Sequence, residues 1–300
     1  MPEDIRDKPY LLHKDILGLN FIRDPGIYLY RRHYRSGLRS YIMQVLNPED
    51  VEKENKGIII DGLRWYPRAE PLKMLRIFRK RFNTLEDAEE ELKRVKIIQT
   101  YLASDYLARP GEFLVDYSRH GKCEILLCGL QEYVQGQILD PWGLLNRDHL
   151  ASLRYDMGFD NTEGSARISD QWIHGVRERA DNFIKKLKQM IAETGRVPDL
   201  AGAGNLILTR PGNIKLVDIN NVSRVSFDSI ISLDDRGYPI CDKSIEALSL
   251  IEQKLLGRSS LRTDPIYDTF LDPERMKEVR ALDEEFQLSM APAMSWPGSS

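Results

Sequence analysis

The first 130 residues show mainly the two-residue alternation of apolar and polar side chains that predicts β-strands. Around an Arg-Ser-Gly sequence, residues 26–46 alternate aromatic or aliphatic with basic side chains, which predicts a hairpin. Two more strands are expected over 57–67 and 72–82, and a pair joined by a turn is expected over 111–134. The charged stretch at 47–57 is expected to be a loop.

One segment of this half has helical periodicity instead. Apolar side chains recur every three or four positions at Leu85, Ala88, Leu92, Val95 and Leu102. Thr84 is placed to cap the N-terminus, and the acidic residues that follow suit the first turn of a helix. The pattern therefore predicts one long helix within a β-rich region.

The second half is mainly helical in its pattern. We expect a helix over 141–158 and a loop over 159–167. A long amphipathic helix then begins at a Ser169 cap and ends at Gly195.

After this helix comes a short apolar hairpin. A further helix is expected to start with Asp242 as its N-cap, and a surface helix is expected over 272–286. The tail from about residue 289 is expected to be disordered. The predicted fold class is α+β, with a β-rich part over 1–130 and a mainly helical part over 131–300.

Composition limits the classes of partner. A net charge of -3 argues against a dedicated nucleic-acid binder, and no apolar run is long enough for a membrane-spanning helix. The acidic N-terminus lacks the apolar core of a signal peptide. Three scattered cysteines indicate free thiols in a reducing compartment, so we expect a cytoplasmic protein without a membrane partner.

Two polar residues flank the apolar hairpin at 205–221. Asn205 lies just before its first strand, and Asp218 lies at the end of its second, thirteen residues later. Mg²⁺ prefers hard oxygen ligands and usually takes only one or two from the protein. A carboxylate and an amide carbonyl form a sufficient pair, although polar residues also end many ordinary strands.

Two stretches earlier in the chain belong to the same argument. The sequence LLCGLQEYVQGQIL at 126–139 leads from an apolar strand into a glycine-containing turn. Arg76 is the lone charge inside the apolar MLRIF, with Lys73 and Lys80 as alternatives because strand alternation alone does not choose among them. On the predicted helix, Glu91 borders the buried face.

In this order, the three stretches resemble the protein-kinase-like superfamily, including small-molecule phosphotransferases of the choline and aminoglycoside kinase type. The resemblance spans most of residues 57–224. It implies a two-lobed fold in which a β-rich lobe with one long helix precedes a mainly helical lobe that carries a metal-site hairpin. ATP and Mg²⁺ are the cofactors that it implies.

The resemblance also implies roles for individual residues. Asn205 and Asp218 would hold Mg²⁺ on the ATP phosphates. Arg76 or Lys73 would contact phosphate, and Glu91 would pair with that cation and orient it.

The stretch at 126–139 would correspond to the hinge that holds the adenine. Leu130 would be the gatekeeper, while the Glu132 carbonyl and the Val134 amide would meet the base. Because a hinge offers backbone groups, residue type matters little there except for a glycine, Gly136, that lets the chain turn.

The sequence departs from the family pattern at the catalytic loop. Asp199 is the only acid available as a base, and it lies six residues before Asn205, where the family has five. The preceding histidine is replaced by Val197-Pro198. Gly202 and Gly204 would let the loop bulge and return Asp199 to the same point.

Two other family features are altered. Ile219-Asn220 replaces the Phe-Gly of the family motif, and a glycine-rich phosphate loop is not evident. Gly37 is a weak candidate for such a loop, and Arg35 and Arg39 would contact phosphate directly instead.

Two functions are therefore predicted as alternatives. The first is an ATP- and Mg²⁺-dependent phosphotransferase that acts on an unknown acceptor, either a small molecule or a protein. The second is a pseudokinase, a nucleotide-binding or structural module that works through a protein partner. The segment 140–168 exceeds what a minimal kinase needs and would shape an acceptor pocket or a partner surface.

Overall fold

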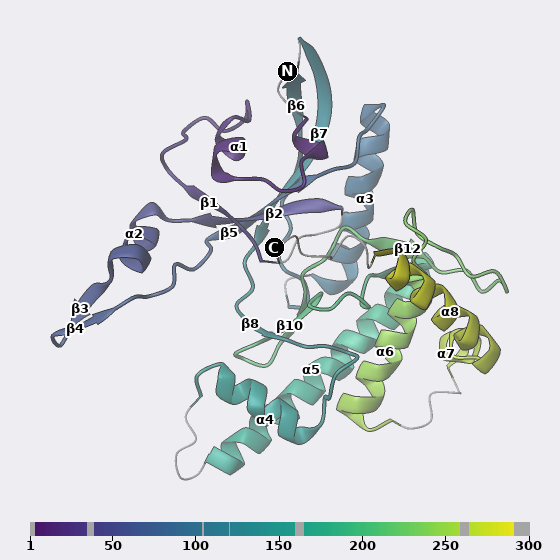
Figure 1. The fold of residues 1–300 in the computed structure, drawn as a ribbon. Helices are drawn as coiled ribbons and strands as arrows, with labels where there is room; N and C mark the ends of the chain where they lie inside the picture. Colours follow the sequence, from purple (N-terminus) through teal and green to yellow (C-terminus); the bar gives the residue numbers. More distant parts are fainter. Residues whose placement is uncertain are drawn as a thin grey trace, which may run out of the picture. The chain divides into compact units, whose positions relative to one another are not determined.

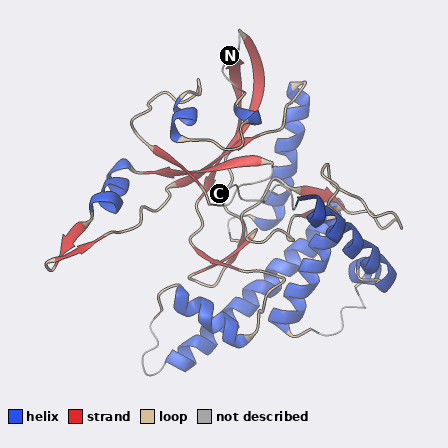
Figure 2. Ribbon diagram, viewed as in Figure 1, coloured by secondary structure: helices blue, strands red, loops and turns tan. Residues whose placement is uncertain are grey.

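The structure is a computed structural model with a mixed α+β architecture (Figure 2). It describes residues 4–34, 39–103, 105–119, 121–159, 165–258 and 264–290. The chain divides into two compact units. The first comprises Met1–Arg94 and Ala108–Tyr133, and the second comprises Val95–Leu107 and Val134–Ser300. The boundary between Tyr133 and Val134 lies near the predicted division at 130/131, but the second unit also takes residues 95–107.

The first unit is built on a five-stranded antiparallel sheet with the spatial order β1-β2-β5-β7-β6 (Figure 1). Its strands are β1 (Leu29–Arg32), β2 (Ser40–Leu46), β5 (Lys73–Phe78), β6 (Glu112–Arg119) and β7 (Lys122–Glu132). The predicted hairpin over 26–46 is confirmed as β1–β2, and the predicted pair over 111–134 is confirmed as β6–β7.

One face of this sheet carries the hydrophobic core of the first unit. Leu75 and Ile77 of β5 pack there with Leu126 and Cys128 of β7. The N-terminal segment covers this face with the short helices η1 (Ile5–Asp7) and α1 (His13–Leu17), which contribute apolar side chains to the same cluster. The alternation along β5 therefore places Arg76 on the opposite face of the sheet.

The prediction of a charged loop at 47–57 is wrong, because the structure has the helix α2 (Pro48–Lys56) there. Asn47 caps it by accepting a hydrogen bond from the Glu49 backbone N–H at 2.9 Å, and Pro48 occupies the first turn. An ion pair between Lys53 and Asp50 at 2.9 Å supports the helix from its surface. No residue of α2 is buried, so its sequence lacks the apolar periodicity that predicts helices.

The strand expected over 57–67 is two strands, β3 (Ile58–Ile60) and β4 (Leu63–Trp65), paired as a hairpin. The turn residues Asp61 and Gly62 both have positive φ, at 50° and 77°, as a two-residue type I′ hairpin turn requires.

The predicted long helix is confirmed as α3 (Leu85–Leu102). Thr84 caps it, since its Oγ1 accepts a hydrogen bond from the Asp87 backbone N–H at 3.1 Å. The helix passes from the first unit into the second after Arg94.

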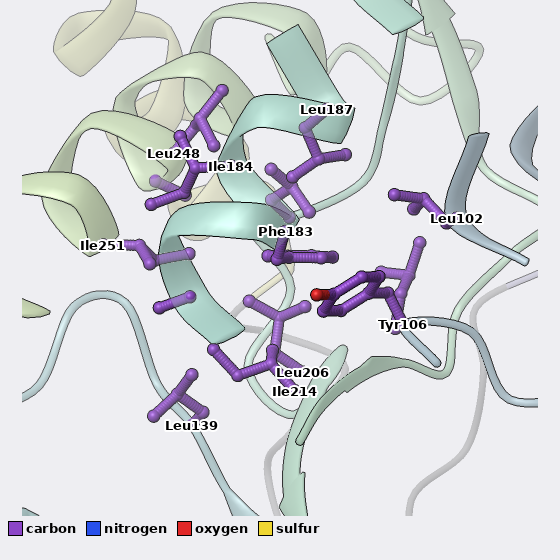
Figure 3. Close-up of a cluster of buried hydrophobic side chains, with 14 of the residues drawn as sticks. Leu102, Tyr106, Leu139, Phe183, Ile184, Leu187, Leu206, Ile214, Leu248 and Ile251 are labelled. Atoms are coloured by element: carbon purple, nitrogen blue, oxygen red, sulfur yellow. The ribbon is translucent and has the colours of Figure 1, made fainter. Parts of the chain in front are cut away.

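The second unit is mainly helical (Figure 1). Its helices besides the end of α3 are α4 (Arg147–Asp156), α5 (Ser165–Thr194), α6 (Ile240–Leu256), α7 (Pro265–Phe270) and α8 (Pro273–Met290). Figure 3 shows part of its core, a single cluster that includes Phe183, Ile184 and Leu187 of α5 and Leu248 and Ile251 of α6, with Ile184 beside Leu248. These side chains are at most 1% exposed, which fixes α5 and α6 against each other.

Several helix ends differ from expectation, and the helix expected over 141–158 spans only Arg147–Asp156, as α4. Ser169 lies inside α5, which begins at Ser165, whereas the predicted end before Gly195 is confirmed. Asp242 is not an N-cap but lies in the first turn of α6, where its buried carboxylate accepts a hydrogen bond from Arg275 Nε at 2.6 Å. The helix α8 continues to Met290, and the remainder of the predicted tail lies outside the described residues.

Two small antiparallel sheets lie in the second unit. A three-stranded sheet has the order β11-β10-β8, and a two-stranded sheet pairs β12 with β9. The strands are β8 (Gly136–Ile138), β9 (Arg196–Pro198), β10 (Leu206–Thr209), β11 (Ile214–Leu216) and β12 (Val222–Arg224). The predicted hairpin at 205–221 is confirmed as β10–β11.

Within the described residues, no helix is both long enough and apolar enough to cross a membrane. All three cysteines carry free thiols. Cys128 and Cys241 are buried, and Cys123 is exposed.

Candidate functional site

The β10–β11 hairpin places Asn205 and Asp218 at the same end. Leu206 pairs with Leu216, and the Val217 backbone N–H donates to the Asn205 carbonyl at 2.8 Å, which extends the ladder by one step. Asn205 therefore directly precedes β10, and Asp218 follows β11 at its open end. Leu206 and Ile214 pack into the core beside Phe183, so the hairpin has a fixed base (Figure 3).

The third strand of this sheet depends on a glycine. Gly136 of β8 pairs with Thr209 of β10, and a Cβ atom on Gly136 would lie 2.3 Å from the Leu208 carbonyl oxygen. Only glycine permits this approach of two backbones. The glycine expected at the turn after β7 is thus required by strand pairing.

Asp199 follows β9 and organises the loop that leads to the hairpin. Its Oδ1 accepts hydrogen bonds from the backbone N–H groups of Ala201 at 3.0 Å and Gly202 at 3.1 Å. Its Oδ2 accepts one from the side-chain amide of Asn221 at 3.2 Å. The carboxylate is therefore held in one orientation by three donors.

The loop also holds the side chain of Asn205. The Asn205 Nδ2 donates to the Asp199 carbonyl at 3.0 Å, which fixes the orientation of the amide. A Cβ atom at Gly202 would lie 2.5 Å from the same Nδ2, so this packing requires a glycine. The sequence predicted a bulge at Gly202 and Gly204, and Gly204 has the positive φ of 86° that such a turn needs.

The charge of Asp218 acts on Asp199. Burial, together with the nearby Asp218 carboxylate, raises the pKa of the Asp199 carboxyl to about 6, although the three hydrogen-bond donors oppose this shift. Near neutral pH the group is therefore close to the point at which it exchanges a proton. Asp199, Asn205 and Asp218 thus form one cluster within the second unit.

The donor set of the cluster fits a magnesium ion. Asn205 uses its Nδ2 internally, so its Oδ1 is the atom available as a ligand, and the Asp218 carboxylate supplies a second hard oxygen. Two carboxylates that repel each other also form a region in which a divalent cation lowers the electrostatic free energy. Across the described ranges, no three His, Cys, Asp or Glu side chains form a metal-binding group.

Two further residues anchor the loop, and the sequence analysis missed both. The Leu200 backbone N–H donates to the buried Ser244 Oγ of α6 at 3.2 Å. Trp142 Nε1 donates to the Ala201 carbonyl at 2.9 Å, so the segment between β8 and α4 contacts the loop directly. Neither residue belongs to a motif, and no sequence signal points to them. Asn221 was also missed, although it lies only three residues after Asp218.

In the first unit, Arg76 lies on β5 and is only 5% exposed. Its face of the sheet also carries Gln44 of β2 and Gln131 of β7, which both lie opposite Met74 in the strand register and are 4% exposed. Lys73 lies two and four residues before Leu75 and Ile77 on β5, so its side chain projects to their face, opposite Arg76. Of these two cations, Arg76 is the one on the buried polar face.

Glu91 of α3 does not pair with the cation that was expected. Its carboxylate forms ion pairs with Lys80 and with Arg94, the latter at 3.3 Å. Lys80, which the sequence offered only as an alternative, is thus the cation that Glu91 holds next to the sheet. The prediction that Glu91 orients Arg76 or Lys73 has no support in these contacts.

The gatekeeper prediction needs a correction. Leu130 lies opposite Leu75 in the register, so its side chain is on the face away from Arg76. Gln131 is on the face of Arg76 instead. A one-residue shift along a strand reverses the face, and the apolar sequence around Leu130 does not reveal which face is which.

The predicted hinge contacts concern backbone groups. Glu132 ends β7, and its backbone N–H donates to the Arg109 carbonyl at 3.0 Å, while its side chain accepts from the Arg109 N–H at 2.9 Å. Val134 lies in the irregular segment between β7 and β8. Gly37 and Arg35 of the suggested phosphate loop lie outside the described residues.

No protein-family model matches the chain, and a search of curated proteins returned no match.

Proposed function

We propose that the chain is an ATP- and Mg²⁺-dependent phosphotransferase with a two-lobed, kinase-like fold. The observation that carries this proposal is the cluster of Asp199, Asn205 and Asp218 at the open end of the β10–β11 hairpin. It joins a carboxylate and an amide oxygen suited to Mg²⁺ with a second carboxylate close to its proton-exchange point. That combination is what phosphoryl transfer to a hydroxyl requires.

The three residues of the cluster would have different roles in the reaction. Asn205 Oδ1 and the Asp218 carboxylate would hold the Mg²⁺ that neutralises the phosphate oxygens. Asp199 would accept a hydrogen bond from the acceptor hydroxyl, orient it and take its proton. Because phosphoryl transfer depends mainly on positioning and charge neutralisation, the metal pair should matter more for nucleotide binding and Asp199 more for turnover.

The residues of the first unit would bind the rest of the nucleotide. Arg76 would contact phosphate, since a guanidinium offers several donors to phosphate oxygens. Backbone groups of Glu132 and Val134 would meet the adenine edge. Gln131, which shares the face of Arg76, would take the place assigned to Leu130 from the sequence.

One observation favours a second candidate, a nucleotide-binding pseudokinase. The Asp199 carboxylate already accepts three hydrogen bonds, two of them from the backbone of its own loop. A residue used in this way shapes the loop whether or not it serves as a base. In the pseudokinase, the cluster would bind nucleotide and Mg²⁺ without transfer.

Titration calorimetry with ATP, with and without Mg²⁺, tests both candidates. The full chain should bind ATP in a Mg²⁺-dependent manner, and Asp218→Ala should lose that dependence. Asp156→Ala, an exposed carboxylate in α4 of the same unit, is the matched control and should bind normally. Absence of ATP binding by the unaltered chain would overturn both candidates.

Slow hydrolysis of radiolabelled ATP then separates the two candidates. A phosphotransferase should release phosphate at a rate that Asp199→Ala lowers while ATP affinity stays within about twofold. A chain that binds Mg²⁺·ATP but shows no hydrolysis above the Asp199→Ala background, with any acceptor tried, is the pseudokinase.

A further inference from the structure

Arg76 and Glu112 belong to one cross-strand row of the five-stranded sheet. Arg76 of β5 pairs with Gly129 of β7, and Gly129 pairs on its other side with Glu112 of β6. Directly paired residues of antiparallel strands project to the same face. Arg76 and Glu112 therefore lie on one face, with a glycine between them.

The missing side chain at Gly129 opens the space between the two charged groups. The outer strands are about 10 Å apart, twice the usual strand spacing. A Cβ atom placed on Gly129 would lie 3.5 Å from Glu112 Oε1 and 3.8 Å from Arg76 Cβ. The Glu112 carboxylate thus extends over the glycine toward the strand that carries Arg76.

The surroundings of Arg76 favour a carboxylate on this face. Arg76 is almost fully buried, and a buried guanidinium is costly unless a negative group and hydrogen bonds compensate its charge. The neighbouring row offers Gln44 and Gln131, which are neutral amides. Among the residues paired in these two rows, Glu112 is the only acid.

The Glu91 carboxylate of α3 pairs with cations other than Arg76. Glu91 is engaged by Lys80, which follows β5, and by Arg94 one turn further along α3. Both are exposed or half-buried, in contrast to Arg76. Glu91 therefore links the helix to the sheet margin.

We propose that Glu112, and not Glu91, is the positioning residue that orients Arg76 toward phosphate. This inference rests on the proposed function, because it assumes that Arg76 contacts the nucleotide. Both partners belong to strands of one sheet, so the direction of the guanidinium does not depend on the position of α3. The phosphate-binding cation is then arranged permanently, and movement of the helix does not switch it.

Binding of ATP and of adenosine by variants of the full chain tests the proposal. Loss of a group that orients a metal ligand commonly costs about 10- to 100-fold in affinity, and we expect an effect of similar size for a group that orients a phosphate-binding guanidinium. Glu112→Gln should weaken ATP binding by about tenfold or more and leave adenosine binding unchanged, since adenosine has no phosphate. Glu91→Gln is the matched control and should bind both ligands as the unaltered chain does.

The outcomes distinguish this inference from the proposed function. If the unaltered chain binds ATP but Glu112→Gln binds it equally well, or if Glu91→Gln is the weaker binder, Glu112 does not orient Arg76. Equal weakening of ATP and adenosine by Glu112→Gln indicates a structural role only and also overturns the inference. Failure of the unaltered chain to bind ATP is instead a failure of the proposed function.

A double-mutant cycle in thermal unfolding keeps the pair testable without any ligand. The variants Arg76→Met, Glu112→Gln and their combination should be strongly non-additive, because the two side chains interact. The combined variant should unfold well above the temperature that the two single shifts predict when added. Additive shifts would show that Arg76 and Glu112 are not partners.

Discussion

Gly202 and Asn205 lie so close that a methyl group on the glycine would stand 2.5 Å from Asn205 Nδ2 and 2.9 Å from its Oδ1. The lack of a side chain at Gly202 leaves room for the Asn205 amide to donate its hydrogen bond to the Asp199 carbonyl. The loop between Asp199 and Asn205 thus contains a glycine on which the position of the proposed metal ligand depends.

The first prediction concerns this glycine. Gly202→Ala should displace the Asn205 amide and weaken Mg²⁺-dependent ATP binding by about tenfold or more, as loss of a ligand's support commonly does. Gly143→Ala is the control, because a Cβ there would meet its neighbours only at ordinary contact distances of 3.6 Å or more. Isothermal calorimetry measures both variants, and an unaltered Mg²⁺ dependence in Gly202→Ala would separate Asn205 from metal binding.

The proposed metal site could be found from sequence because its parts are local. Asn205 and Asp218 belong to one hairpin, so their spacing and the turn between them indicate that they meet. The loop anchors could not be found in this way. Ser244 lies 44 residues from Leu200, and Trp142 lies 59 residues from Ala201, so these contacts arise only from tertiary packing.

The sheet of the first unit illustrates a second limit. Periodicity located β5 and β7, but assigning a side chain to a face needs the register and the core that covers one side. The gatekeeper role was therefore given to Leu130 and not to Gln131. Lys80 was not identified as the partner of Glu91, since Arg76 lies in β5 and Lys80 follows the same strand. The helix α2 was missed because none of its residues is buried, so it shows no apolar periodicity. Its N-cap and its charged residues specify it instead.

A second prediction concerns the pH dependence of stability. Asp4 and Arg6 form a buried ion pair at 2.8 Å, and Arg81 donates to the same carboxylate at 3.0 Å. Burial alone would raise the pKa of Asp4, but these hydrogen bonds outweigh it and hold the pKa well below its ordinary value. A depressed pKa in the folded state means that the ion pair stabilises the fold above about pH 4 and loses this effect as the pH falls further.

Asp4→Asn should therefore lower the free energy of unfolding at pH 7 by about 3 kcal/mol, because the buried Arg6 loses its buried carboxylate partner and keeps only the more exposed Glu124. The difference from the unaltered chain should shrink progressively below about pH 4. Urea unfolding at pH 7, 5 and 3 measures it, with Asp24→Asn in an exposed loop as the control. A difference that stays constant with pH would contradict the ionic interpretation.

A third prediction addresses the strand that follows β7. Gly136→Ala would place a methyl group 2.3 Å from the Leu208 carbonyl oxygen, which is backbone and has little room to move. Separation of β8 from β10 should cost about 1–3 kcal/mol of stability, typical of overpacking. Gly26→Ala, where a Cβ would meet nothing within 4 Å, is the control. Equal melting temperatures of the two variants would contradict the close pairing of β8 with β10.

The last prediction concerns the anchor of the Asp199 loop. Ser244→Ala removes the acceptor of the Leu200 N–H, so a buried donor is left without a partner at a cost of about 1–3 kcal/mol. Because Leu200 directly follows Asp199, the loop should also lose its fixed geometry. We expect ATP hydrolysis to fall several-fold while Mg²⁺·ATP affinity changes little, since Asn205 and Asp218 remain on the hairpin.

Ser249→Ala is a close control for this change. Ser249 is also buried on α6, but its Oγ donates to the Glu246 carbonyl of the same helix at 2.7 Å and not to the loop. Its substitution should leave hydrolysis unchanged, even if the helix loses some stability. If both serine variants reduce hydrolysis equally, the effect comes from α6 as a whole. If only Ser244→Ala does so, the hydrogen bond to Leu200 holds the loop in its active geometry.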